Sequence, residues 1–185
     1  MTLASYISCS RIVLIVPIVY LLDQGWRVDS PSFYNYLAFV LFVIAGLTDY
    51  LDGYIARKTN TETQLGALLD LIADKLLVSL VIVWILSFEI NSLVTIPALI
   101  IVARELVIST LRQYVIEKRE KKDLSVSFIG KSKTTIQIIA ISMLILAQEI
   151  TSIYTLALIA IWFASFFSLY SLFTYVSEWF KHFSN

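Results

Sequence analysis

Six apolar runs, each close to or above the length of a membrane-spanning helix, limit most strongly what this chain can fold into. A helix needs about 20 apolar residues to cross roughly 30 Å of hydrocarbon, and a backbone in lipid must satisfy its hydrogen bonds within its own helix. The sequence therefore predicts an all-α integral membrane bundle of six transmembrane helices, in one domain that covers residues 1–185. The predicted helices are 3–22, 34–58, 65–88, 92–117, 130–148 and 154–180.

Composition and charge exclude several other classes of protein. Hydrophobic residues make up 58% of the chain and charged residues 15%, against about 25% charged residues in an average soluble domain. A water-soluble protein of this size could not bury so much apolar surface. Fourteen Lys and Arg balance fourteen Asp and Glu, which gives no support for a nucleic-acid partner. One Cys and one His exclude an intrachain disulfide and a zinc site.

The distribution of Lys and Arg predicts how the chain is oriented in the membrane. The loops of one side hold only Arg27, whereas the other side holds the remaining clusters: Arg57, Lys58, Lys118, Arg119, Lys121, Lys122, Lys131, Lys133 and Lys181. Because positive charge favours the cytoplasmic side, both termini and the loops 58–64 and 118–129 are expected in the cytoplasm. A bacterial inner membrane is the default expectation.

Four aspartates interrupt the second and third apolar runs, where a charge at mid-bilayer costs on the order of 3 kcal/mol. Asp49 and Asp52 are three residues apart, and Asp70 and Asp74 are four apart, so each pair shares one helical face. The short loop between the two helices predicts an antiparallel hairpin. Asp52 would then lie level with Asp70, and Asp49 level with Asp74. We expect the four carboxylates to converge in one cluster that faces the cytoplasm.

Such a cluster needs compensation, since the carboxylates repel one another and too few basic residues are expected to face them. Oxygen-only ligands favour Mg²⁺, Mn²⁺ or Ca²⁺. Two divalent ions would balance four negative charges and leave coordination positions for phosphate oxygens. A proton relay or cation pathway is the competing use of the same carboxylates.

Small residues and an arginine beside the aspartates favour phosphoryl chemistry over a relay. Gly53, Ala56 and Gly66 either let helices approach closely or clear room for a ligand. Arg57 is suited to bidentate contact with phosphate. A proton relay or cation pathway would need neither room for a ligand beside the aspartates nor the arginine.

The aspartates and their neighbours together resemble the signature of the CDP-alcohol phosphotransferase family. Eight residues at fixed spacing over 26 positions carry the resemblance: Asp49, Asp52, Gly53, Ala56, Arg57, Gly66, Asp70 and Asp74. The resemblance implies a six-helix membrane enzyme, usually a homodimer, that displaces CMP from a CDP-linked lipid with an alcohol. It extends from about residue 8 onward. One departure is that Leu3–Ser10 precede Arg11 without the Asn-Pro-Asn element that often opens the family's sequences.

The resemblance also implies roles for individual residues. Asp49, Asp52, Asp70 and Asp74 would hold two Mg²⁺ or Mn²⁺ ions, and Asp74 would act as general base on the incoming hydroxyl. The cytidine-diphosphate pocket would be lined by Asp49, Gly53, Ala56, Arg57 and Gly66.

Two further segments, 103–112 and 130–137, resemble the phosphatidylglycerophosphate synthase branch, whose substrates are CDP-diacylglycerol and glycerol 3-phosphate. Arg112, Lys131 and Lys133 would bind the acceptor phosphate, although the two lysines are equally explained as cytoplasmic anchors. Arg104 is expected to pair with a carboxylate across helices. The alternatives are another acceptor (phosphatidylglycerol, inositol phosphate or serine) or, in a different class, a cation or proton transporter.

Overall fold

The computed structural model describes residues 3–27, 33–59, 64–89, 91–117 and 128–183, and the regular secondary structure of these residues is all α-helix. Within these ranges it describes the backbone alone for residues 3–5, 7, 49–59, 64–65, 67–68, 70, 112–117, 128–133 and 178–183. The six helices are α1 (Leu3–Trp26), α2 (Phe33–Thr59), α3 (Gln64–Phe88), α4 (Ser92–Glu117), α5 (Phe128–Ala147) and α6 (Thr151–Phe183).

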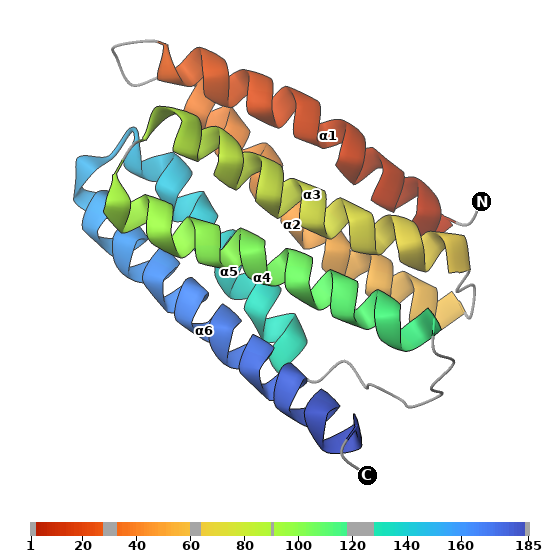
Figure 1. Cartoon of the computed structure of the whole chain (residues 1–185). Helices are drawn as coiled ribbons and strands as arrows, with labels where there is room; N and C mark the ends of the chain where they lie inside the picture. Colours follow the sequence, from red (N-terminus) through yellow and green to blue (C-terminus); the bar gives the residue numbers. More distant parts are fainter. Residues whose placement is uncertain (1–2, 28–32, 60–63, 90, 118–127, 184–185) are drawn as a thin grey trace.

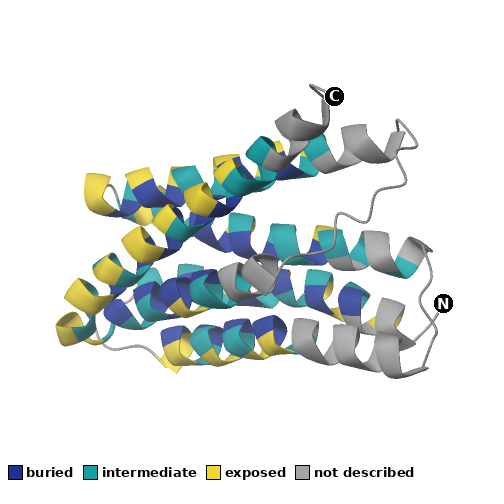
Figure 2. Cartoon of the chain, turned by 90° about the horizontal axis from the view of Figure 1, so that it is seen from below, coloured by how far each residue is buried: buried dark blue, intermediate teal, exposed yellow. Residues whose placement is uncertain are grey.

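The helices run up and down in one elongated bundle (Figure 1). Helix α1 packs along both α2 and α3, α6 packs along both α4 and α5, and α2 joins the two groups by packing on α5. Both chain termini lie at the same end of the bundle in Figures 1 and 2, which we call the terminal end. There α1, α3 and α5 begin, and α2, α4 and α6 finish. At the opposite end α1, α3 and α5 finish, and α2, α4 and α6 begin.

The second and third helices, predicted to pack as a hairpin, are antiparallel but have a third helix as their main neighbour. Helices α2 and α3 are consecutive and antiparallel, and they touch each other, but each packs more extensively against α1. The first helix is therefore a neighbour of both aspartate-bearing helices, which the loop length between those two helices could not indicate.

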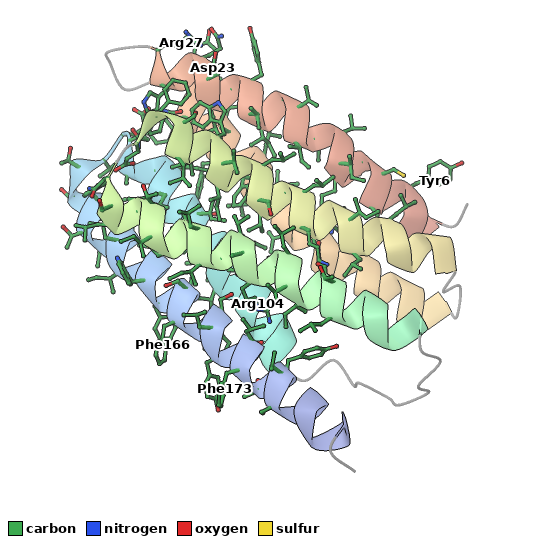
Figure 3. All side chains as sticks on the ribbon, in the orientation of Figure 1. Tyr6, Asp23, Arg27, Arg104, Phe166 and Phe173 are labelled. Atoms are coloured by element: carbon green, nitrogen blue, oxygen red, sulfur yellow. The ribbon has the colours of Figure 1, made fainter. Side chains whose placement is uncertain are left out.

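Burial in the bundle is that of a membrane protein, with small and large apolar residues inside and many large apolar residues outside. Buried positions include Ala45 of α2, Ala98 of α4 and Ala164 of α6, and small residues at such positions allow helices to approach closely. Phe166 and Phe173 of α6 are exposed and project outward (Figure 3). The buried residues follow the inner faces of the helices (Figure 2). An exposed apolar surface of this extent is stable only against lipid or other apolar groups.

Within the described residues, four helices are long and apolar enough to cross a membrane by length and composition, over Ser8–Trp26, Leu71–Phe88, Ser92–Leu111 and Thr151–Ser177. The chain is thus an integral, multi-pass membrane protein. Over the residues whose side chains are described, the apolar parts of α2 and α5 are shorter, Phe33–Thr48 and Thr134–Ala147. The prediction of six helices is confirmed, and four of them meet this spanning criterion over their described side chains alone.

Side-chain hydrogen bonds fasten the opposite end of the bundle. Asn35 Nδ2 of α2 donates to Glu149 Oε1, beyond the end of α5, over 2.6 Å. Tyr154 of α6 donates from its hydroxyl to Glu89 Oε1 over 2.7 Å and accepts from Asn91 Nδ2 over 2.8 Å. Asn91 also accepts from the backbone N–H of Leu93, which makes it the N-cap of α4. These bonds connect the ends of α2, α3, α4 and α6 and the α5–α6 connection.

Most helix boundaries agree with the predicted ones within three residues, and the exception is the end of α1. The sequence predicts that end at residue 22, whereas the helix continues to Trp26. Arg27 donates to the Asp23 carboxylate over 2.8 and 2.9 Å at i, i+4 spacing, and such a pair supports the last helical turn. These bonds also raise the pKa of Arg27 above its ordinary value.

Candidate functional site

The terminal half of the bundle carries a charge pair between α1 and α3. Arg11 of α1 donates from Nη1 to Oδ1 of Asp74 on α3, and the two groups form a salt bridge across 63 positions of sequence. The Arg11 side chain is fully buried, whereas 30% of the Asp74 side chain remains exposed. The carboxylate of Asp74, one of the four predicted metal ligands, therefore stays partly accessible, whereas the Arg11 guanidinium that contacts it is buried.

This pair corrects the expectation that basic residues do not face the aspartates in sufficient number. For Asp74, at least, a guanidinium is supplied by α1, because α1 packs directly along α3. A signal for Arg11 was present in the sequence, where it is the charged residue that interrupts the first apolar run. A buried charge in a membrane helix usually pairs with an opposite one, but the sequence did not say with which.

The predicted metal-binding and nucleotide-binding residues lie on the parts of α2 and α3 nearest the terminal end. Gly66 and Asp74 belong to α3 and are both partly exposed. The side chains of the other members lie outside the described residues, and these members are Asp49, Asp52, Gly53, Ala56, Arg57 and Asp70. Helix α2 is unbroken from Phe33 to Thr59, so the backbone positions of Asp49 and Asp52 are one turn apart, as predicted.

The predicted acceptor-phosphate residues also belong to helical segments. Arg112 lies in the last two turns of α4, and Lys131 and Lys133 lie in the first two turns of α5. Their side chains lie outside the described residues. These three assignments stay predictions.

Beside the Arg11–Asp74 pair, a second polar contact joins α3 to α4. Lys75, next to Asp74, donates from Nζ to Oγ of Ser109, and Ser109 in turn donates to the backbone carbonyl of Glu105 over 2.6 Å. Lys75 and Ser109 are residues that the sequence did not single out. Lys75 could have been noticed as the cation that directly follows the last aspartate of the motif.

A third polar group lies deeper, between α4 and α6. Arg104 is 7% exposed and lies inside the bundle (Figure 3). Its Nη2 donates to Ser171 Oγ of α6 over 2.8 Å, and its Nη1 lies 3.3 Å from Glu105 Oε1 on the same helix. Among the described contacts, Arg104 therefore pairs with its neighbour in sequence and donates to a serine across helices. The predicted pairing with a carboxylate across helices stays a prediction. Ser171 was not predicted, since serines are common in apolar helices.

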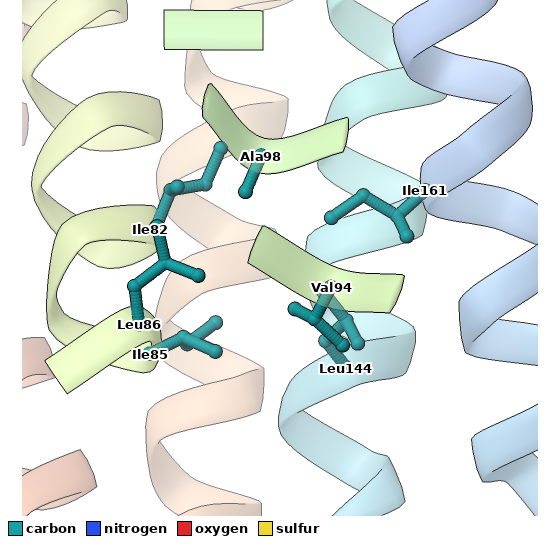
Figure 4. Close-up of a pocket in the computed structure, with 7 residues that line it drawn as sticks. All are labelled: Ile82, Ile85, Leu86, Val94, Ala98, Leu144 and Ile161. Carbon is teal, nitrogen blue, oxygen red and sulfur yellow. The ribbon is translucent and has the colours of Figure 1, made fainter. Parts of the chain in front are cut away.

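A small apolar pocket of the described structure is not a candidate site. It comprises about 150 Å³ of space between atoms, part of which is open to the outside, and it is lined by apolar side chains of α3, α4, α5 and α6, among them Ile82, Val94, Leu144 and Ile161 (Figure 4). With no polar group in its lining, it offers nothing to orient a charged substrate. The chemistry of the described chain is concentrated around Asp74 instead.

Comparisons with known proteins agree with the motif on α2 and α3. A family model described as CDP-alcohol phosphatidyltransferase matches residues 1–170. A protein of Rickettsia bellii named CDP-diacylglycerol–glycerol-3-phosphate 3-phosphatidyltransferase is 37% identical over 184 residues, which cover 98% of this chain and 97% of that protein. A protein of the same name from Escherichia coli is 37% identical over 169 residues, 89% of this chain and 88% of its own length. Another, from Haemophilus influenzae, is 40% identical over 134 residues, 69% of this chain and 72% of its own.

Proposed function

The chain belongs to the CDP-alcohol phosphatidyltransferase family, and on this basis we propose that it transfers a phosphatidyl group from CDP-diacylglycerol to glycerol 3-phosphate. The products are phosphatidylglycerophosphate and CMP, so the enzyme serves phospholipid synthesis. The observation that carries this conclusion is the similarity to the Rickettsia bellii protein of that name, which extends over 98% of this chain. A match confined to the motif would identify the family and leave the acceptor open.

In the proposed reaction, a hydroxyl oxygen of glycerol 3-phosphate forms a bond to the phosphorus that carries the diacylglycerol. The bond from that phosphorus to the CMP oxygen breaks, and CMP leaves with the electron pair. Asp74 accepts the hydroxyl proton, a role open to a carboxylate within reach of the substrate. In support, the Asp74 side chain is partly exposed while its partner Arg11 is buried behind it.

We assign two Mg²⁺ or Mn²⁺ ions to the carboxylates of Asp49, Asp52, Asp70 and Asp74. The described part of this set fits such ions, since Asp74 offers oxygen, the ligand atom that hard cations prefer, on an accessible side chain. Bound there, the ions would neutralise the pyrophosphate and stabilise the charge on departing CMP.

The remaining residues are assigned to the two substrates. Gly53, Ala56, Arg57 and Gly66, together with Asp49, would form the nucleotide pocket, in which small residues leave room for the ligand and Arg57 contacts phosphate. Arg112, Lys131 and Lys133 would bind the phosphate of the acceptor. Arg112 lies in the last two turns of α4 and the two lysines lie in the first two turns of α5, toward the terminal end of the bundle.

We further propose that the terminal end faces the cytoplasm of a bacterial cell and that the enzyme is a homodimer. The orientation is supported by the excess of Lys and Arg at that end, which the positive-inside rule assigns to the cytoplasm. The homodimer is supported by the family's usual assembly alone.

The test is release of CMP by the purified protein in detergent or lipid, with CDP-diacylglycerol and a series of acceptors. We expect turnover with glycerol 3-phosphate and Mg²⁺ or Mn²⁺, and no turnover with a chelator. Asp74→Asn should lower the rate by at least about 10²-fold, the usual contribution of a general base. The matched control is Asp23→Asn, which removes an aspartate from the opposite end of the bundle and should keep the wild-type rate.

Two results would count against the proposal. Metal-independent turnover would refute the assignment of metal ions to the aspartates. An Asp74→Asn enzyme with the wild-type rate would refute the role of Asp74 as general base. Preference for serine or another acceptor without a phosphate would retain the family but overturn the basic acceptor site.

A further inference from the structure

One buried amide of α5, that of Gln137, lacks a partner among the described residues. The side chain is 2% exposed, and its Nε2 atom has no hydrogen-bond partner in the part of the chain that the structure describes. A buried amide without a partner is unfavourable, and in native proteins such a group usually meets a water molecule or a ligand. Buried serines are a weaker signal, since a hydroxyl can rotate to bond a carbonyl of its own helix.

Gln137 lies at about the depth of Asp74, on the inner side of the bundle. Leu144 of α5 and Ile82 of α3 line the same apolar pocket (Figure 4), and both helices begin at the terminal end. From that pocket toward the terminal end, Gln137 lies seven residues along α5 and Asp74 eight residues along α3, which correspond to rises of about 10.5 and 12 Å. Seven residues are almost two full turns, so Gln137 shares the inward face of Leu144.

A second contact places the same turn of α5 beside α2. A Cβ built on Gly46 would lie 2.8 Å from Cδ1 of Ile138, the residue that follows Gln137. Asp49 is three residues beyond Gly46 toward the terminal end, a rise of about 4.5 Å. Gln137 therefore lies within about one helical turn of the level of two proposed metal ligands, Asp49 and Asp74.

Gln137 also follows closely on a residue that is assigned to the acceptor. Lys133 lies four residues before it in α5, one turn or about 6 Å nearer the terminal end, and is proposed above to bind the acceptor phosphate. An acceptor that has its phosphate at Lys133 and its reacting hydroxyl at Asp74 would lie next to the turn of α5 that carries Gln137.

We propose that Gln137 is a specificity-determining residue, whose amide bonds the hydroxyl of glycerol 3-phosphate that does not react. The inference rests on the proposed function, which supplies this acceptor. Glycerol 3-phosphate has a primary hydroxyl at C1, the less hindered nucleophile, and a secondary hydroxyl at C2, next to the carbon that bears the phosphate. A hydroxyl can both donate to and accept from an amide. An acceptor without the C2 hydroxyl leaves the buried amide unpaired and is therefore disfavoured.

The experiment compares two acceptors that differ only in the C2 hydroxyl. Purified protein in detergent receives CDP-diacylglycerol, Mg²⁺ and either glycerol 3-phosphate or 3-hydroxypropyl phosphate, and CMP release gives kcat/KM for each acceptor. The readout is the ratio of the two values, because damage to the fold, the metal site or the phosphate site lowers both values alike.

Wild-type protein should prefer glycerol 3-phosphate by about tenfold or more, the effect of one hydrogen bond. In Gln137→Met, which keeps the side-chain length but removes the amide, this preference should nearly disappear, mainly through a lower kcat/KM for glycerol 3-phosphate. Gln148→Met is the matched control, because it makes the same change in an exposed glutamine at the opposite end of the bundle, and it should keep the wild-type ratio. If Gln137→Met does not fold, Gln137→Asn, whose amide is withdrawn by one methylene, should lower the ratio in the same direction by a smaller factor.

Equal use of both acceptors by wild-type protein, or a wild-type preference in Gln137→Met, would overturn the inference and leave the proposed function intact. An equal loss with both acceptors in Gln137→Met would also overturn it, since Gln137 would then bond a structural water. So would a loss of preference in Gln148→Met as large as in Gln137→Met. Wild-type protein that releases CMP only with acceptors that lack a phosphate would refute the proposed function and this inference together.

Discussion

A single added methyl group at Gly25 should loosen the end of the bundle that lies away from the termini. Gly25 is buried near the end of α1, and a Cβ built there would overlap the side-chain amide of Asn35 on α2, with Nδ2 at 2.9 Å and Oδ1 closer still. Asn35 is only 2% exposed and donates to Glu149 over 2.6 Å. In Gly25→Ala the amide has to move, and the bond that ties α2 to the α5–α6 connection is lost or weakened.

The size of the effect follows from three terms. A hydrogen bond to a charged group contributes about 1.5–3 kcal/mol in soluble proteins, and polar contacts in a membrane bundle average about 0.6 kcal/mol. Alanine recovers at most about 1 kcal/mol of helix propensity over glycine, and less at a helix end. We therefore expect Gly25→Ala to lower the free energy of unfolding by about 1–2 kcal/mol.

Unfolding of purified protein in mixed micelles of mild detergent and dodecyl sulfate, followed by circular dichroism, measures this difference. The matched control is Gly46→Ala. There the nearest atom to the new Cβ is Ile138 Cδ1 at 2.8 Å, the mobile tip of a side chain, so the net change should stay below about 1 kcal/mol. In an Asn35→Ala background the cost of Gly25→Ala should nearly disappear, because the group it displaces is gone. A Gly25→Ala protein as stable as Gly46→Ala, or a cost that persists without Asn35, would refute the reasoning.

Three further predictions concern other parts of the bundle. Tyr154→Phe removes the hydroxyl that bonds Glu89 and Asn91, and it should lower the free energy of unfolding by about 1 kcal/mol in the same assay, whereas Tyr20→Phe on the exposed face of α1 should not. Ser171→Ala removes a hydroxyl of α6 to which Arg104 donates and should destabilise the protein by about 0.6–2 kcal/mol. Ser165→Ala, whose hydroxyl donates to the Trp162 carbonyl of its own helix, should cost less. The third prediction concerns orientation and uses a protein whose native Cys9 is replaced by serine. A cysteine introduced at Lys121 should react with a membrane-impermeant maleimide only from the cytoplasmic side, and one introduced at Arg27 only from the other side. The opposite labelling pattern in sealed cells and inverted vesicles would refute the predicted orientation.

How far the site could be predicted differs from residue to residue. Asp74 and Gly66 were marked by the fixed spacing of the motif, and the structure places both on α3 toward the terminal end. The partner of Asp74 could not be predicted, because Arg11 lies 63 positions away and only the packing of α1 against α3 brings them together. Arg104 illustrates the same limit. Its need for a partner was clear from its charge, while the choice of Ser171 depended on how α4 and α6 are rotated about their axes.

The sequence by itself determined that six helices form, nearly where each begins and ends, and which short stretch of α2 and α3 concentrates acidic residues. Length and hydropathy are enough for this, since in lipid each helix satisfies its own backbone and its limits are set by local composition. Only the tertiary structure decided that α1 lies along both aspartate-bearing helices and that a buried guanidinium stands behind Asp74. The physical reason is that lipid-facing and helix-facing surfaces are both apolar in a membrane bundle, so the pattern of apolar residues does not record which face of a helix meets which neighbour.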